Sequence, residues 1–292
     1  MKLHRPLISA VCLAVAVAAQ AQQHLVDVIY GHKMGVALTM DVFEPAKPNG
    51  IGVIWFVSGG WFSSHDDVNP LIAKPFTDRG MTVFEVVHGS QPKFQIPEIL
   101  SDVNRAVRFI RVNSATWHVD PNRLGVSGGS AGGHLDLMIG AYGGPGDPNA
   151  KDPVDRASSA VEAIACFFPP TDMVNFGSPG REPFREDTYK PFWPAFGFTD
   201  KTSKEDMDKL AKDYSPIYGV TAKFPPTFVM HGDADKLVPL QQSQELMDKL
   251  QELGVPHKLV VKKGAGHGFW LGMDKDMNQF ADWFEKYLGK AK

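Results

Sequence analysis

The order of apolar and helix-like segments predicts an α/β fold, with a mostly parallel central sheet covered by helices on both faces. Short apolar runs recur along the chain, and segments with helical spacing lie between them. One of these runs, Ile51 to Val57, is apolar throughout, as a strand buried on both faces requires. Strands that alternate with helices favour parallel pairing, because each helix returns the chain to the same edge of the sheet.

The first 21 residues are expected to be a signal peptide. Lys2 and Arg5 form a basic start, and the apolar run Leu7 to Ala19 is too short to span a bilayer, which disfavours a membrane anchor. The segment Ala19-Gln20-Ala21 fits a cleavage site. We therefore expect a secreted or periplasmic protein whose mature chain begins near Gln22 and has no membrane span.

The net charge, the cysteine count and the chain length limit which partners and which kind of fold are expected. The formal net charge is −3, and removal of Lys2 and Arg5 lowers it by two, which is too mild to indicate a nucleic-acid partner. Cleavage leaves Cys166 without a second cysteine, so the core has to stabilise the chain. The apolar neighbours of Cys166 predict a buried strand residue rather than a nucleophile. Residues 22–292 suffice for a single α/β domain.

The individual elements follow from this pattern. Leu25–Tyr30 and Val36–Phe43 are expected to form a hairpin with a turn near Gly31 to Gly35. The remaining strands are expected at Ile51–Val57, Val83–Val87, Arg123–Val126, Ala163–Phe168, Thr227–Met230 and Lys258–Val261. Helices are expected at Ile96–Val112, Ala131–Tyr142, Pro239–Leu253 and Asp274–Tyr287.

Residues 175–218 interrupt the alternation of strands and helices. The segment is long, rich in proline and aromatic residues, and lies between two expected strands. A long insertion in an α/β enzyme is typically a cap or a binding loop, and the alternative is a hydrophobic cluster that packs the insertion onto the body. We expect a partial cap, with Trp193 as one wall of a substrate pocket.

The stretch Gly128-Gly129-Ser130-Ala131-Gly132 reads G-x-S-x-G between an expected strand and an expected helix. This context is typical of a nucleophile elbow, in which a strained serine sits on a tight turn and larger neighbours would collide. The N–H of Ala131, at the start of the helix, would then point at an oxyanion. The motif alone is also compatible with an ordinary glycine-rich turn, so its partners decide the interpretation.

Those partners occur later in the chain, in the order that the elbow topology requires. A serine hydroxyl needs a base, and the base needs an orienting acid. His267, flanked by glycines, follows one expected strand, and Asp233 and Asp235 follow another. Loops after the carboxyl ends of parallel strands meet at one edge of the sheet. We expect Ser130 as nucleophile, His267 as base and Asp235 as orienting acid, with Asp233 as a turn residue.

The stretch Ser58-Gly59-Gly60-Trp61 directly follows the first buried strand. Glycine lets the backbone approach a substrate closely, so Gly59 and Gly60 are expected to supply oxyanion donors together with Ala131. Trp61 is expected to contact the substrate. A loop with these donors would complete the machinery for acyl transfer.

At these motifs the chain resembles the α/β-hydrolase fold, in the branch of secreted carboxylesterases that includes acetyl-xylan, feruloyl and hormone-sensitive-lipase-like esterases. The stretches that carry the resemblance are Val53–Trp61, Asp120–Leu137, Ser215–Pro239 and Gly264–Phe269. The resemblance implies an exported serine esterase. Such enzymes usually read H-G-G-G-W in the first loop, where this chain has Val57 and Ser58 in place of the histidine and the first glycine. The departure removes a histidine that normally braces the loop.

We therefore expect hydrolysis of carboxylic esters through an acyl-enzyme, with no metal and no cofactor. The acyl and alcohol groups stay open, and acetyl or feruloyl esters of plant polysaccharides are candidates. One alternative is a serine peptidase of the prolyl-oligopeptidase type, which the lack of a propeller-length N-terminal region disfavours. Another is a non-catalytic binding protein on the same scaffold, which the intact Ser, Asp and His set disfavours.

Other polar residues near the motifs are expected to have no catalytic role. His134 and Ser127 are expected to be structural, and His65, Asp66 and Asp67 are expected to form a solvated loop rather than a metal site. His88, which follows the strand Val83–Val87, has no mechanistic role that the sequence suggests; it could line the pocket or cap the strand.

Overall fold

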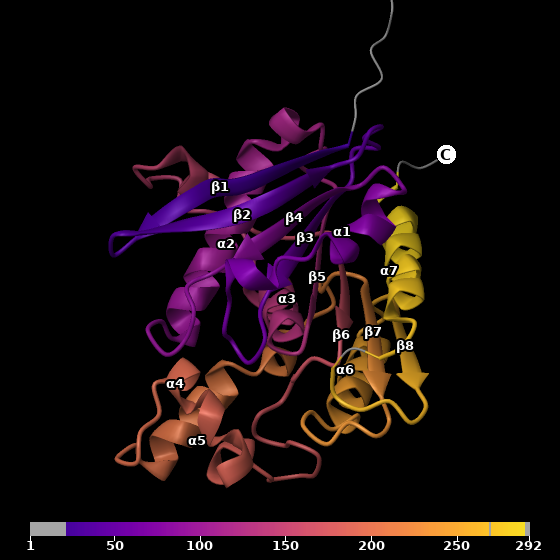
Figure 1. The fold of residues 1–292 in the computed structure, drawn as a ribbon. Coiled ribbons are helices and arrows are strands. Elements are labelled where there is room, and N and C mark those ends of the chain that lie inside the picture. The colour runs from indigo at the N-terminus through magenta and orange to yellow at the C-terminus, as the bar shows by residue number, and fades with distance from the viewer. Residues whose placement is uncertain (1–21, 269, 290–292) are drawn as a thin grey trace, which may run out of the picture.

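The computed structural model describes residues 22–268 and 270–289, and the expected signal peptide lies outside them. Eight strands form one sheet: β1 (Gln23–Lys33), β2 (Val36–Glu44), β3 (Gly52–Val57), β4 (Thr82–Val87), β5 (Leu124–Gly129), β6 (Ala163–Phe167), β7 (Thr227–Gly232) and β8 (His257–Lys262). Their order in the sheet is β1-β2-β4-β3-β5-β6-β7-β8 (Figure 1). β2 pairs antiparallel with β1 and β4, and every other pairing is parallel.

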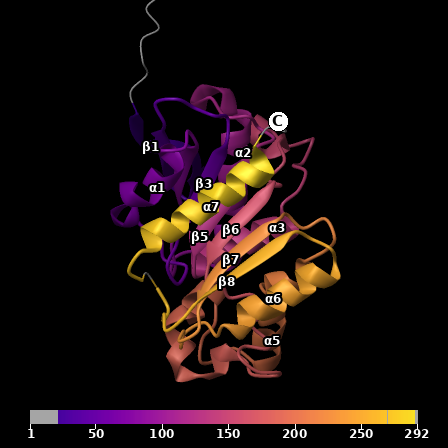
Figure 2. The same ribbon diagram turned by 90° about the vertical axis from the view of Figure 1, so that its right-hand side faces the viewer.

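Helices cover both faces of this sheet. The helices of the described residues are α1 (Pro70–Thr77), α2 (Ile96–Val112), α3 (Ala131–Tyr142), α4 (Trp193–Phe196), α5 (Lys204–Asp213), α6 (Gln241–Glu252) and α7 (Met273–Leu288), of which α4 and α5 lie beyond the strand ends and not on a face of the sheet. α1 and α7 share one hydrophobic cluster with the sheet, and α2, α3 and α6 share the other. Figure 2 shows α7 crossing in front of the central strands. The predicted class, a mostly parallel sheet between two helical layers, is confirmed.

The central strands are mostly apolar because both of their faces are covered. Every residue of β3 is buried, as is every residue of β4 and β6. Successive side chains of a strand point to opposite faces, so a strand between two helical layers has no position for an exposed polar side chain. Cys166 in β6 is one of these buried residues, as its sequence context predicted.

Two local features differ from the sequence-based expectation. The hairpin turn is tighter than predicted, because Gly31 still pairs with Leu38 and only Met34 and Gly35 remain between the strands. Both turn residues have positive φ, 47° and 77°, which suits the twist of a two-residue hairpin. α1 was not predicted, and it starts from Asn69, whose side chain accepts the Leu71 N–H.

The insertion of residues 175–218 lies between β6 and β7 and contains α4 and α5. It lies beyond the carboxyl ends of the strands, at the bottom of Figure 1. Its aromatic side chains pack on one another, with the rings of Phe184 and Phe196 4.2 Å apart between centroids. The Tyr189 hydroxyl donates to the Leu237 carbonyl at 2.9 Å, which fastens the insertion to the loop after β7. In the described part of the chain, no helix is both long and apolar enough to cross a membrane.

Asp136 is an uncompensated buried acid in the middle of α3. Its side chain is fully buried, and within residues 22–268 and 270–289 neither carboxyl oxygen has a hydrogen-bond partner. Burial raises the pKa of Asp136 well above its ordinary value. The folded protein therefore holds this carboxyl in its neutral form more strongly than the unfolded chain does.

This acid should make the folded protein less stable as pH rises. The folded-state pKa of Asp136 is raised. The contribution of its carboxyl group to folding stability is therefore fully present below the unfolded-state pKa of 3.8, and it is lost as the pH rises through the folded-state pKa. Asp136→Asn should match wild type in free energy of unfolding near pH 4 and exceed it increasingly above, by up to about 1.4 kcal/mol per pH unit. Urea unfolding across this range measures the difference, with the exposed Asp248→Asn on α6 as control. Parallel curves for Asp136→Asn and wild type would contradict the assignment.

Candidate active site

Ser130 lies on the sharp turn between β5 and α3. Its φ of 54° and ψ of −116° are rarely adopted by residues other than glycine. The turn closes because its neighbours lack side chains: a Cβ on Gly128 would lie 2.7 Å from the Gly132 carbonyl carbon, and one on Gly132 would lie 2.8 Å from the Phe56 oxygen. The Ser130 N–H donates to the Phe167 carbonyl at 3.0 Å. The serine hydroxyl is thereby held at the end of the sheet.

His267 connects Ser130 to Asp235. Its Nε2 lies 2.9 Å from Ser130 Oγ, and its Nδ1 lies 2.7 Å from Asp235 Oδ2. The other carboxylate oxygen accepts the N–H groups of Leu237 and Val238, each at 2.9 Å, which fixes its orientation. Because an ionised carboxylate only accepts, His267 Nδ1–H donates to Asp235, and Nε2 is left to accept the serine proton.

The environment of Asp235 keeps it ionised. Burial alone would raise its pKa, but hydrogen bonds from His231 and His267 and from the Val238 N–H outweigh burial and hold the pKa well below its usual range. His231 Nε2 lies 3.3 Å from Asp235 Oδ2, and His231 Nδ1 lies 2.7 Å from Ser243 Oγ. Sequence reasoning did not single out His231. Its position four residues before Asp235 in His231-Gly232-Asp233-Ala234-Asp235 was the available signal.

Asp233 has a different partner. Its Oδ1 accepts the Gly264 N–H at 2.6 Å, which ties the loop after β7 to the loop after β8. The structure thus brings Asp235 to His267 and leaves Asp233 at the base of the loops.

The structure corrects one of the expected oxyanion donors. The Gly59 N–H donates to the Phe62 carbonyl at 3.0 Å, so it closes the turn of its own loop and does not face a substrate. Gly60 and Ala131 line the pocket at Ser130, and their N–H groups have no hydrogen-bond acceptor among the described residues. These two groups remain as the donors that an oxyanion would meet.

Ser130 opens onto two pockets of different size and character. The first, the small pocket, has a volume of about 40 Å³. It is lined by Gly60, Trp61, Ser130, Ala131, Pro170, Met173, Phe176, Pro183, Phe184, Tyr189, Phe192, Leu237 and Val238. The second, the wide groove, has a volume of about 720 Å³ and is lined by His267 together with polar residues that include Asp66, Asp67 and Asn69. Insertion residues supply the apolar wall of the small pocket.

The two tryptophans expected at the substrate have different positions. Trp61 lines the small pocket, and its indole N–H donates to His134 Nδ1 at 3.2 Å. Trp193 lines neither pocket, since its indole N–H donates to the Phe184 carbonyl at 2.9 Å inside the insertion. The expectation for Trp193 is wrong, and the adjacent Phe192 lines both pockets. Successive residues of a helical turn point about 100° apart, so the sequence could not tell which aromatic faces inward.

The other polar residues near the site have structural partners. His134 is fully buried below the elbow, with Nε2 2.7 Å from the Tyr214 carbonyl, and burial lowers its pKa to about 4. Ser127 Oγ donates to the Ala165 carbonyl at 2.6 Å. Asp66 and Asp67 are exposed, as expected of a solvated loop, and this loop is also a wall of the wide groove.

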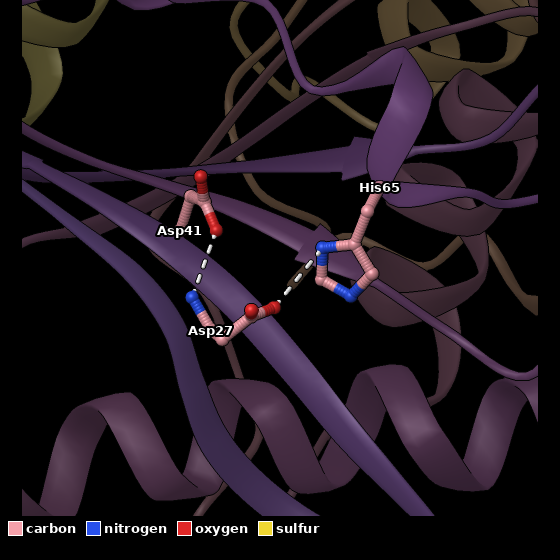
Figure 3. A group of neighbouring side chains, drawn as sticks. All are labelled: Asp27, Asp41 and His65. Carbon is pink, nitrogen blue, oxygen red and sulfur yellow. Dashed lines mark hydrogen bonds and ion pairs between the residues drawn. The ribbon is translucent and has the colours of Figure 1, made fainter.

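His65 belongs to a cluster that the sequence did not suggest. Figure 3 shows Asp27, Asp41 and His65 from β1, β2 and the loop after β3 pointing toward one another. Asp41 Oδ1 accepts the Asp27 N–H at 3.1 Å, and His65 Nδ1 lies 3.4 Å from Asp27 Oδ1. One ligand-type atom of each residue lies within 4.8 Å of the others. Because His65 Nε2 also bonds Thr39 Oγ1 at 2.6 Å, we describe the group as a polar link between the hairpin and the loop.

The chain is similar in sequence to proteins described as esterases. The chain is 27% identical to Esterase LipQ of Mycobacterium tuberculosis over 240 residues, which is 82% of this chain and 53% of that protein. It spans about half the length of the first curated relatives that it matches.

Among solved structures, a truncated carbohydrate esterase from gut microbiota is 25% identical with a TM-score of 0.73, over 92% of this chain and 98% of that one. Esterase Est2 of Thermogutta terrifontis, with propionate bound, is 25% identical with a TM-score of 0.69, over 94% and 98%. The predicted α/β-hydrolase fold is confirmed. Residues 40–250 match the BD-FAE family model, and the chain therefore belongs to the BD-FAE family.

Proposed function

We propose that this protein is a serine hydrolase that cleaves carboxylic esters through an acyl-enzyme on Ser130. The observation that carries the proposal is the unbroken hydrogen-bond chain from Ser130 through His267 to Asp235 at the carboxyl edge of the sheet. The similarity to proteins described as esterases supports the same reaction class.

The reaction follows from the positions of these groups. Ser130 Oγ attacks the ester carbonyl carbon while its proton moves to His267 Nε2, and Asp235 stabilises the imidazolium that forms. The N–H groups of Gly60 and Ala131 stabilise the negative charge on the carbonyl oxygen. The alcohol leaves with the proton from His267. Water then attacks the acyl-enzyme through the same histidine and releases the acid.

A fluorophosphonate probe tests the reaction class. Wild type should be labelled and should hydrolyse p-nitrophenyl acetate, whereas Ser130→Ala should fold, stay unlabelled and lose activity by about 10⁴–10⁶. A folded wild-type protein that resists labelling and hydrolysis would instead be a binding protein. Labelling together with cleavage of peptides but not of esters would favour a serine peptidase.

The two aspartates give a second test. Asp235→Asn should lower kcat by roughly 10⁴, because an amide leaves His267 in the wrong tautomer to accept the serine proton. Asp233→Asn is the matched control: its side chain can still accept the Gly264 N–H, so kcat should change little. Steady-state kinetics on p-nitrophenyl acetate, with thermal melting to check folding, decide the matter. A larger loss of kcat in Asp233→Asn would reverse the assignment.

The position of His267 supports an assignment of the two halves of the ester to the two pockets. The leaving alcohol has to take its proton from His267 Nε2, so it must lie on the histidine side of Ser130. His267 lines the wide groove and is not among the residues that line the small pocket. We therefore infer that the alcohol occupies the wide groove and that the acyl group enters the small pocket.

The sizes of the two pockets favour a short acyl group on a large alcohol. A pocket of about 40 Å³ favours an acetyl group over the much larger feruloyl group, whereas the groove of about 720 Å³ has room for sugar units. Asp66, Asp67 and Asn69 give the groove acceptors and donors for hydroxyl groups. We propose acetylated plant polysaccharides as the substrate class, in line with the carbohydrate esterase and the propionate-bound esterase that the chain resembles. Release of acetate but not ferulate from modified xylans checks this proposal.

The insertion should set acyl length through Phe192. Phe192→Ala removes a wall of the small pocket, so kcat/KM for p-nitrophenyl butyrate and hexanoate should rise relative to acetate. Trp193→Ala is the neighbouring control, and it should lower the melting temperature while keeping the wild-type preference. A series of p-nitrophenyl esters measures both variants. A preference that changes in Trp193→Ala and not in Phe192→Ala would refute this account of the cap.

Export remains part of the proposal. Residues 1–21 have the basic start, apolar run and small-residue site of a signal peptide, and they lie outside the described residues. A secreted or periplasmic location would give the enzyme access to polysaccharide esters. The mass of the protein recovered from the cell exterior or periplasm should correspond to a chain that begins at Gln22, and an uncleaved, cytoplasmic chain would overturn this part.

A further inference from the structure

The loop that carries the Gly60 donor, residues 58–61 and here called the oxyanion loop, has a strained backbone. Gly60 has a φ of 55° and Trp61 a φ of 63°. Glycine adopts this left-handed region easily, but a tryptophan does so only where the surrounding structure enforces it. Trp61 is also buried, so the strain lies at the floor of the small pocket. Some part of the fold must hold this conformation.

We propose that the segment of residues 88–91 is a clamp that holds the oxyanion loop, with His88 as a positioning residue that acts through the Ser58 hydroxyl. The proposal rests on the proposed function, because it assigns a role in oxyanion stabilisation. It adds residues 88–91, which line neither pocket, and it gives a role to the hydroxyl of Ser58, a residue in the wall of the wide groove.

Gln91 holds the strained part of the loop from one side. Its side-chain N–H donates to the Gly60 carbonyl at 2.5 Å, and its backbone N–H donates to the Trp61 carbonyl at 3.2 Å. Gln91 is itself buried, so no water competes freely for these two bonds. The two carbonyls belong to the two residues with positive φ, so these bonds fix the two peptides that follow the Gly60 donor. The Gly60 N–H itself belongs to the Gly59–Gly60 peptide, whose carbonyl accepts the Phe62 N–H at 2.9 Å.

His88 holds the start of the loop. Its Nδ1 lies 2.9 Å from the Gly89 carbonyl, and its Nε2 lies 2.9 Å from Ser58 Oγ. A carbonyl only accepts, so the proton is on Nδ1, and Nε2 must accept from the Ser58 hydroxyl. His88 is buried, and burial lowers its pKa to about 4, which keeps it a neutral acceptor. The direction of both bonds is thereby determined.

Ser58 links the clamp to the elbow. Its carbonyl accepts the Gly132 N–H at 3.3 Å, while its hydroxyl donates to His88. One residue therefore ties the loop of Gly60 to the first turn of the helix that carries Ala131. The two oxyanion donors lie on separate segments, and Ser58 sets their relative position.

The clamp is anchored in the body of the fold. The Gly89 N–H donates to Asp102 on α2 at 3.0 Å, and Lys33 on β1 donates to the same carboxylate at 2.9 Å. Ser63 accepts the His88 N–H at 3.1 Å and donates to the Val57 carbonyl at 2.5 Å. Ser58 and Trp61, the two ends of the oxyanion loop, therefore bond to His88 and Gln91. Ser63 also connects His88 to β3.

This arrangement explains why the chain has Val57 and Ser58 where the esterases it resembles carry a histidine and a glycine. A glycine at position 58 has no hydroxyl to offer to His88. The brace comes from the neighbouring strand end, and it needs the serine and the histidine together. His88, for which the sequence suggested no role, is one half of that pair.

Three variants and one double variant test the clamp. Ser58→Ala and His88→Leu should each lower kcat for p-nitrophenyl acetate by about 10-fold to 100-fold with KM nearly unchanged, less than the 10²–10³ that loss of a whole donor costs. The double variant should lose no more than the larger single effect, because both changes break the same bond. His88→Gln, which retains an acceptor, should recover most of the activity.

The outcomes separate the clamp from the proposed function. If wild type neither binds a fluorophosphonate nor hydrolyses esters, the proposed function fails, and the clamp fails with it. If wild type is active and folded Ser58→Ala keeps the wild-type kcat, the clamp alone is overturned. Multiplicative losses in the double variant, or equal losses in His88→Gln and His88→Leu, would also overturn it. If His88→Leu does not fold, Ser58→Ala still decides, since the half-buried Ser58 hydroxyl is not part of the core.

Discussion

The turn at Ser130 is the constraint on which the rest of the site depends. A serine with positive φ can follow a buried strand and precede a helix only if the residues two before and two after it lack side chains, as Gly128 and Gly132 do. The helix then starts beside the end of β3, where the Gly132 N–H donates to the Ser58 carbonyl at 3.3 Å. Because the turn fixes the position of the Ser130 hydroxyl, His267 and Asp235 can form a hydrogen-bond chain to it.

Buried histidines support this centre from several sides. His231 touches Asp235, His134 bonds the Trp61 indole, and His88 bonds the Ser58 hydroxyl. Burial lowers the pKa of His88 and His134 to about 4, so these two rings act as fixed hydrogen-bond partners and not as charges. In the proposed mechanism, His267 is the histidine that moves a proton, since it alone lies between Ser130 and an ionised carboxylate.

The asymmetry of the two pockets has a topological origin. The insertion leaves the sheet after β6 and covers the side of Ser130 where Gly60, Trp61 and Ala131 lie, and its aromatic residues leave little space there. The loop after β3 lies on the other side, and it carries Asp66 and Asp67 along an open groove that reaches His267. A hydrolase with this arrangement would discriminate strongly on the acid side of an ester and weakly on the alcohol side.

Local chemistry made much of this protein predictable. The period of apolar residues indicated the strands and most helices, because a strand buried on both faces has to be apolar throughout. The order of Ser130, Asp235 and His267 at strand ends indicated the site, since parallel strands deliver their following loops to one edge. Even the choice between Asp233 and Asp235 followed from the turn chemistry of the loop, and the structure places Asp235 beside His267.

Tertiary structure alone decided which side chains of a segment face the site. Gly59 closes its own turn with Phe62, and Trp193 turns into the insertion while Phe192 faces the pockets. These outcomes depend on rotations of a third of a turn or on one backbone hydrogen bond, and a sequence pattern does not encode either. The same holds for His88, whose partner lies 30 positions away on another strand end. The sequence by itself determined the sheet, the elbow and the order of the reacting residues; packing between distant segments decided the donors, the pocket walls and the braces.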